Sequence, residues 1–115
     1  MGRSLSKWQA VASEYANAAT HPEAARMLYY RALSLKHKGL RHDAKSSMAK
    51  WWGVKVANEV LYTCLRLNGH YGFAKELPHE QRLRDCIGME SADRPRKVHH
   101  SIIARDLLGK EFAPF

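Results

Sequence analysis

Apolar residues recur at spacings of three and four positions along most of the chain, and this periodicity limits what the chain can fold into. Near the start, the pattern runs through Trp8, Val11, Ala12, Tyr15 and Ala19. Such spacing places the apolar side chains on one face of an α-helix. No segment alternates apolar and polar residues in the manner of a half-buried strand. The sequence therefore predicts an all-α fold.

Four helical stretches follow from the pattern, at about residues 5–38, 43–67, 78–87 and 94–108. Pro22 interrupts the first stretch, because proline has no amide hydrogen and its ring clashes with the preceding turn of a helix. The apolar spacing resumes after Pro22. This stretch is therefore either two helices or one helix with a kink near residue 22.

Residues at the predicted ends suit helix boundaries. Gly39 is expected just after a helix, since glycine readily adopts the left-handed backbone conformation found there. Asp43 and Asp93 are suitable N-caps, because their side chains can accept hydrogen bonds from free amides of the first turn. Pro95 suits the first turn of the last helix. We therefore predict that Asp93 caps that helix.

The chain has the size of one compact domain, covering residues 1–115. Hydrophobic residues make up 45% and charged residues 26%, which argues against disorder. The stretch 43–67 is apolar on more than one face, which is typical of a helix buried between neighbours. The interpretation is an up-and-down helical bundle. Because several helices are broadly apolar, we expect the bundle to leave an apolar face that needs cover.

The net charge of +8 indicates a surface that attracts phosphate groups. Basic residues cluster at 36–45 and at 94–97. The charge alone suggests one hypothesis, that the chain is a nucleic-acid-binding module. No recognition helix supports this hypothesis, and Trp51 and Trp52 suit a helical core better. Nucleic acid is therefore not an expected partner.

Metal binding, disulfides and membrane insertion are not expected. Cys64 and Cys86 lie far from a CxxC spacing, so no zinc site is predicted and reduced thiols are the simpler interpretation. No apolar run approaches the roughly 20 residues that cross a bilayer. The N-terminal segment lacks the apolar core of a secretory signal. A cytoplasmic location is the expectation.

Short motifs in fixed order resemble the C-terminal domain of the FAD-dependent acyl-CoA dehydrogenases. MGRSLSKWQAV at 1–11 and AARMLYYRA at 24–32 match two family segments with the expected gap. MAK at 48–50, NGHYGF at 68–73 and the charged stretch 80–85 follow. SADRPRKVH at 91–99 is similar to an A-D-G-P-x-E-V-H variant of the family's catalytic loop, and IIAR at 102–105 completes the match. The resemblance spans essentially the whole chain, but only the last third of a typical family member.

The resemblance implies a set of site residues and a chemistry. In the family, a carboxylate just before the last helix removes the α-proton of an acyl-CoA thioester while a hydride passes to flavin. That position is Asp93 here. The same resemblance implies a cofactor edge for FAD, formed by Gln9, Arg66, Gly69, His70, Pro95 and Lys97.

The chain departs from the family pattern at that edge. Arg94 stands where the family has a glycine that lets backbone approach the cofactor, and His70 replaces the second glycine of its loop. The family's sheet domain and first long bundle helix have no counterpart here, and the match begins inside a motif. We therefore expect a truncated gene, a split gene or an excised fragment that is inactive alone. Its expected partners are a second copy or a chain that supplies the sheet domain, with acyl-CoA as substrate. The alternative is a non-catalytic oligomerisation or interaction module derived from that fold.

Overall fold

The computed structural model describes residues 2–109 and 111, and these residues are helical without any strand. In chain order, the elements are η1 Leu5–Lys7, α1 Gln9–His37, α2 Asp43–Leu67, η2 Gly69–Phe73, α3 His79–Gly88 and α4 Arg96–Leu108. The η elements are short 3₁₀ turns. The all-α prediction is confirmed.

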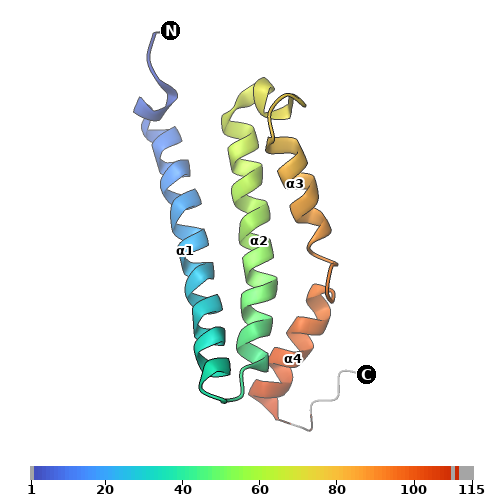
Figure 1. The fold of residues 1–115 in the computed structure, drawn as a ribbon. Coiled ribbons are helices and arrows are strands. Elements are labelled where there is room, and N and C mark those ends of the chain that lie inside the picture. The colour runs from blue at the N-terminus through green and yellow to red at the C-terminus, as the bar shows by residue number, and fades with distance from the viewer. Residues whose placement is uncertain (1, 110, 112–115) are drawn as a thin grey trace.

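Helix α2 lies in the middle of the molecule (Figure 1). Helix α1 runs antiparallel along one side of it, while α3 and α4 follow each other along the other side. Among the described elements, α2 contacts α1, α3, α4 and η2, whereas α1 contacts only α2 and η1. The four α-helices thus form three columns, and the bundle is open rather than closed around a central core.

The open arrangement leaves little of the chain buried. The Cα radius of gyration is 17.9 Å, whereas a compact chain of this length would have about 13 Å. The buried apolar residues are Ala32, Ala44 and Val56. Large side chains such as Met27, Tyr29 and Tyr30 remain exposed. The uncovered apolar surface expected from the sequence is present in this chain.

Helix α1 continues through Pro22 as one helix of 29 residues. A proline in a helix removes one backbone hydrogen bond, and the turns on both sides supply the others. The helix ends as the sequence predicts: Gly39 has a φ of +68°, and the amide of Leu40 returns to the carbonyl of Leu35 at 3.0 Å. This pattern satisfies free carbonyls at the helix end.

The prediction that Asp93 caps the last helix is wrong. Helix α4 begins at Arg96 with Pro95 as N-cap, and no side chain provides a cap hydrogen bond. The residue before a proline avoids helical backbone angles, so the helix does not extend back past Pro95. Asp93 and Arg94 instead have φ values of +55° and +90°. Similarly, Asp43 is the first residue of α2, and His42 occupies the cap position.

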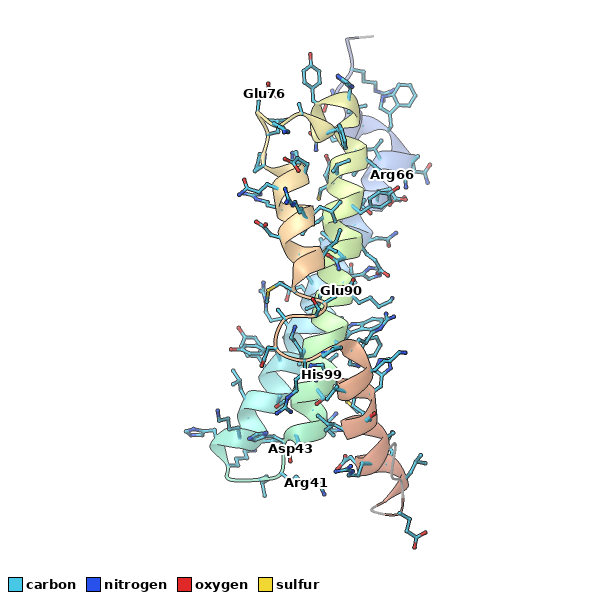
Figure 2. All side chains as sticks on the ribbon, turned by 90° about the vertical axis from the view of Figure 1, so that its right-hand side faces the viewer. Arg41, Asp43, Arg66, Glu76, Glu90 and His99 are labelled. Atoms are coloured by element: carbon cyan, nitrogen blue, oxygen red, sulfur yellow. The ribbon has the colours of Figure 1, made fainter. Side chains whose placement is uncertain are left out.

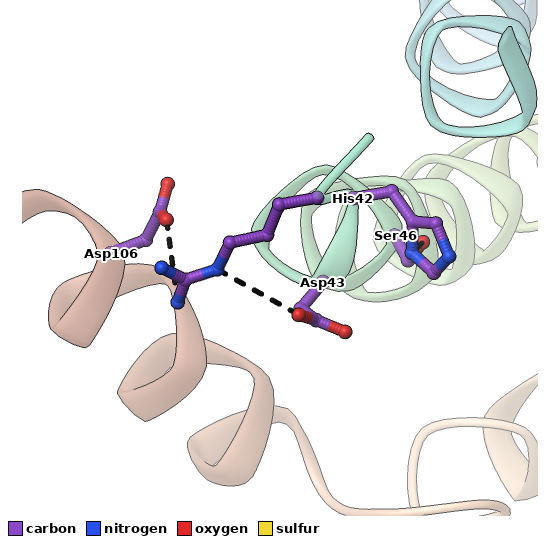
Figure 3. A network of polar contacts seen from close by, with 5 residues as sticks. His42, Asp43, Ser46 and Asp106 are labelled. Atoms are coloured by element: carbon purple, nitrogen blue, oxygen red, sulfur yellow. Dashed lines mark hydrogen bonds and ion pairs between the residues drawn. The ribbon is translucent and has the colours of Figure 1, made fainter. Parts of the chain in front are cut away.

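The turn between α1 and α2 reaches across to α4. The Arg41 guanidinium lies 3.8 Å from the Asp43 carboxylate and 3.7 Å from the Asp106 carboxylate. Dashed lines in Figure 3 mark both ion pairs. Both ion pairs are long and solvent-exposed, so each contributes at most about 1 kcal/mol. Packing against α2, rather than these charges, positions α4.

Gly72 makes a close approach that a larger residue would prevent. A Cβ atom on Gly72 would overlap the backbone carbonyl of Leu65 in α2. We predict that Gly72→Ala lowers the free energy of unfolding by about 2 kcal/mol, since the backbone must shift to make room. The matched control is Gly53→Ala, where the added methyl group meets nothing within 4 Å; it should raise stability by about 0.5–1 kcal/mol. Urea denaturation measures the free energy of unfolding of both variants, and equal changes in the two variants would contradict the prediction.

The backbone of Arg94 is in a conformation that suits glycine. We predict that Arg94→Gly raises the free energy of unfolding by about 1 kcal/mol, because it relieves the unfavourable φ. Arg96→Gly is the matched control: it removes the same charge but places glycine in a helix, which costs up to about 1 kcal/mol. Thermal denaturation followed by circular dichroism compares them. A lower melting temperature for Arg94→Gly than for the unmodified chain would contradict backbone strain at Arg94.

Candidate functional site

The loop that joins α3 to α4, residues 89–95, is tied to the middle of α2 by two hydrogen bonds. The Lys50 ammonium donates to the carbonyl oxygen of Met89 at 2.7 Å, and the Asn58 side-chain amide donates to Glu90 Oε1 at 2.6 Å. Lys50 and Asn58 lie on α2, two turns apart. The loop that carries Asp93 is therefore held against the central helix.

A small pocket lies under this loop, where α4 begins. It is lined by residues of α2, of the loop and of α4: Lys50, Trp51, Val54, Lys55, Met89, Glu90, Arg94, Arg96 and His99. Its cavity volume of about 20 Å³ is close to that of a single water molecule. Four cationic side chains and one carboxylate surround it.

His99 is the buried polar residue of this pocket. Its side chain is on the inner face of α4, and the residue is only 8% exposed. Neither ring nitrogen has a hydrogen-bond partner among the described residues. Figure 2 shows His99 below Glu90, near the start of α4. A buried imidazole without partners is energetically unfavourable unless a water or a ligand satisfies it.

The surroundings of His99 oppose a positive charge on the ring. Burial lowers its pKa from the ordinary value, and the nearby charges of Lys50 and Arg94 lower it further. The carboxylate of Asp93 and the backbone of Arg94 act in the opposite direction, but with less effect. The ring's approach to the Arg94 backbone does not meet the geometry of a hydrogen bond, so the ring nitrogens remain without a partner among the described residues. The imidazole is therefore neutral near pH 7, with one nitrogen able to donate and the other able to accept a hydrogen bond.

Three of the predicted site residues lie at this junction. Asp93, Pro95 and Lys97 are all exposed, and none of them lines the pocket. Asp93 is in the left-handed region, which an aspartate tolerates better than most residues. The junction thus presents the Asp93 carboxylate to solvent on a loop whose ends are fixed.

The other four predicted residues lie elsewhere. Gln9 begins α1, Arg66 is near the end of α2, and Gly69 and His70 are in η2. All four are exposed and lie toward the end of the molecule that carries η2 (Figures 1 and 2). Along α2, Arg66 is about 24 Å from Lys50, at a rise of 1.5 Å per residue. The predicted residues therefore form two separate groups.

Sequence reasoning missed the residues beneath the loop. Lys50, Asn58 and His99 come from helical stretches whose spacing gave no sign of shared contacts. His99 could have been identified as a site residue, because it lies one helical turn after Pro95 and on the face of α4 that packs against α2. Asn58 could not, since its partner Glu90 is remote in sequence and meets it only in the folded chain.

Other site classes receive no support from the part of the chain that the structure describes. Within residues 2–109 and 111, no three His, Cys, Asp or Glu side chains are grouped as metal ligands. Cys64 and Cys86 are free thiols, and burial raises the pKa of Cys86. No described helix combines the length and the apolar character needed to cross a membrane.

Comparison with known proteins identifies the fold. The family model for the acyl-CoA dehydrogenase C-terminal domain matches residues 1–108. The chain is 34% identical over 103 residues to the short-chain specific acyl-CoA dehydrogenase of Clostridium acetobutylicum, covering 90% of this chain and 27% of that protein. It is 32% identical over 109 residues to the caffeyl-CoA reductase–Etf complex subunit CarC of Acetobacterium woodii, covering 95% and 29%.

A solved structure agrees in backbone geometry. Butyryl-CoA dehydrogenase from Megasphaera elsdenii superimposes with a TM-score of 0.91 at 27% identity, covering 94% of this chain and 28% of that one. The chain thus spans less than a third of the length of each of these relatives. Its sequence motifs, its helical order and its backbone all agree on the same part of these enzymes. The chain belongs to the acyl-CoA dehydrogenase family and corresponds to its C-terminal domain.

Proposed function

We propose that this chain contributes a helical wall to a composite acyl-CoA dehydrogenase site and is inactive by itself. The separation of the predicted site residues supports this proposal. Gln9 at the start of α1, Arg66 near the end of α2, and Gly69 and His70 in η2 are exposed, whereas the Asp93 loop is tied to the middle of α2. A single site that used both groups would need further protein to enclose it.

The residues present do not fit FAD within one copy of this chain. The pocket at the α3–α4 junction has a volume of about 20 Å³, whereas ligand pockets usually measure about 300–1,000 Å³. Arg94 also places a side chain where relatives are expected to have glycine. We therefore propose that any FAD is bound only when the missing segments are supplied, by another chain or by a longer form of this one.

Within such a composite site, we propose Asp93 as the base that removes the α-proton of an acyl-CoA thioester. The carboxylate is exposed, and Lys50 and Asn58 fix the loop that carries it. A base must be held within hydrogen-bonding reach of the proton it removes, so a fixed loop favours this role. No other carboxylate on the junction combines exposure with freedom from a partner side chain: Glu90 accepts a hydrogen bond from Asn58.

The alternative proposal is a non-catalytic interaction module that keeps the fold without the chemistry. Exposed apolar side chains along α1, such as Tyr29, Tyr30 and Leu33, favour it. An apolar groove between α1 and α2 adds to this surface, and it is lined by Pro22, Ala25, Gly53, Val56, Ala57, Val60 and Leu61. Both proposals require a partner, and they differ in whether flavin is held in the complex.

The two proposals are separated by supplying the missing segments. The chain is co-expressed with the preceding part of the Clostridium acetobutylicum short-chain enzyme, the complex is purified, and retained flavin and thioester oxidation are measured. We expect flavin only in the complex. Asp93→Asn should lower the oxidation rate at least about 100-fold while flavin is retained, because the general base is lost.

Asp85→Asn is the control for that experiment, since Asp85 is an exposed carboxylate of α3 outside the junction. It should leave the rate within about twofold, as surface changes away from a site usually do. Tight flavin binding by the lone chain would disprove the composite site. A complex that assembles but holds no flavin would favour the interaction module instead.

Self-association through the α1–α2 groove is a further expectation of both proposals. We predict that the chain forms a concentration-dependent oligomer in sedimentation experiments, since burying apolar surface contributes about 25 cal/mol per Å². Ala57→Arg should shift the equilibrium toward monomer, because a charge would have to be buried in the groove. Gln81→Arg, which adds the same charge on the exposed surface of α3, should not. A monomer at every concentration would contradict this prediction.

A further inference from the structure

The end of the molecule opposite η1 carries exposed leucines from two segments of the chain. Leu40 lies in the turn between α1 and α2 and is 54% exposed, while Leu107 and Leu108 close α4 and are 69% and 68% exposed. Arg41, which follows Leu40, pairs with Asp106, which precedes Leu107, so the two segments lie together. Figure 1 shows the α1–α2 turn and the last turn of α4 at the same end of the molecule.

Unpaired cations lie on the same two segments. Lys36, Lys38 and Arg105 are exposed, and none of them forms an ion pair among the described residues. The carboxylates of Asp43 and Asp106 are both paired with the same guanidinium. This end of the molecule therefore combines exposed apolar side chains with positive charge that the chain itself does not neutralise.

The cations and Leu40 also have ordinary structural roles. Cations suit the C-terminal end of a helix, where the helix dipole is negative. A hydrophobic residue at the position of Leu40 often packs back on the last turn of the helix that it follows. More than half of Leu40 nonetheless remains in water, and neither role requires the exposed leucines at the end of α4. An exposed apolar surface beside unpaired cations is typical of proteins that bind to the surface of an anionic bilayer.

We propose that residues 36–43 and 105–108, which we call the basic tip, form a docking surface for a membrane with anionic lipid headgroups. The exposed leucines enter the boundary between headgroups and acyl chains, and the unpaired cations contact lipid phosphates. Lysine suits this arrangement, because its aliphatic stem can lie along apolar surface while its ammonium stays in water. A nucleic-acid backbone would match the cations but would leave the leucines in water. A bilayer accounts for both features.

Docking at the basic tip leaves the surfaces of the proposed dehydrogenase site free. The molecule measures 61 × 25 × 23 Å, and the basic tip lies at one end of its long axis. The Asp93 loop is tied to the middle of α2, and Gln9 and Arg66 lie toward the opposite end. A bilayer at the basic tip therefore covers neither group of predicted site residues. Membrane docking needs no flavin and no second chain, so this proposal and the proposed function can fail independently.

The test is sedimentation of the full chain with lipid vesicles. Vesicles of phosphatidylcholine mixed with phosphatidylglycerol are compared with vesicles of phosphatidylcholine alone. We expect saturable binding to the anionic vesicles only, and weaker binding as salt is raised, because salt screens the charges. Lys38→Gln should lower the partition coefficient about fivefold, the usual effect of one basic residue at an anionic surface. Leu40→Ser should lower it at least about fivefold, because less apolar area leaves water on binding.

The matched controls lie in η1, at the other end of the molecule. Leu5→Ser removes a leucine that is 58% exposed, and Lys7→Gln removes an exposed lysine. Both positions are roughly 40 Å from the basic tip along α1. Each control should leave the partition coefficient within about 1.5-fold. Leu107→Ser is a second apolar variant that leaves the α1–α2 turn intact, and circular dichroism checks that every variant is folded.

Losses in the variants of the basic tip, with binding kept in the controls, support the proposal. Equal losses in Lys38→Gln and Lys7→Gln would show that net charge alone attracts the vesicles. Unchanged binding in both Leu40→Ser and Leu107→Ser would show that the leucines do not enter the bilayer. The chain is also titrated with a labelled DNA duplex, and binding to DNA without binding to anionic vesicles would indicate a nucleic-acid surface instead. Each of these three results, or absence of any vesicle binding, would overturn the proposal.

Discussion

The packing of every other helix against α2 is the constraint on which this structure depends. Because α1 touches neither α3 nor α4, the described residues form no closed core, and Val56 on α2 is the most deeply buried large side chain among them. Hydrophobic stabilisation scales with the apolar area removed from water. An elongated molecule of 61 × 25 × 23 Å therefore gains less from folding than a compact one of the same length. The small apolar area buried within the chain explains why both proposed functions require a partner.

The junction between α3 and α4 also depends on α2. Two side chains of α2, Lys50 and Asn58, hold the loop from beneath, and the loop in turn covers the buried imidazole of His99. The backbone of Asp93 and Arg94 lies in the left-handed region. Such conformations persist when surrounding contacts fix them. The result is an exposed carboxylate above a small cationic pocket, which are two chemically different features on one loop.

The local sequence was sufficient to predict the helices but not the residues at which they begin. Spacings of three and four predicted the helical stretches, and Gly39 ended the first as expected. Pro22 left two possibilities open, and α1 is a single helix through it. Asp93 failed as a cap because Pro95 restricts the residue before it, a conflict between two local signals at the same helix start. Intrinsic helix propensities are too weak to decide between two such signals.

The sequence by itself determined that the chain is helical, that it carries a net positive charge, and that its motifs match the C-terminal domain of the acyl-CoA dehydrogenases. These properties are set by neighbouring residues and by the order of short motifs. Only the tertiary structure decided which side chains meet. Asn58 reaches Glu90 across 32 positions, and His99 loses its partners only when α4 packs on α2. Contacts of this kind depend on how helices pack, and helical periodicity does not encode them.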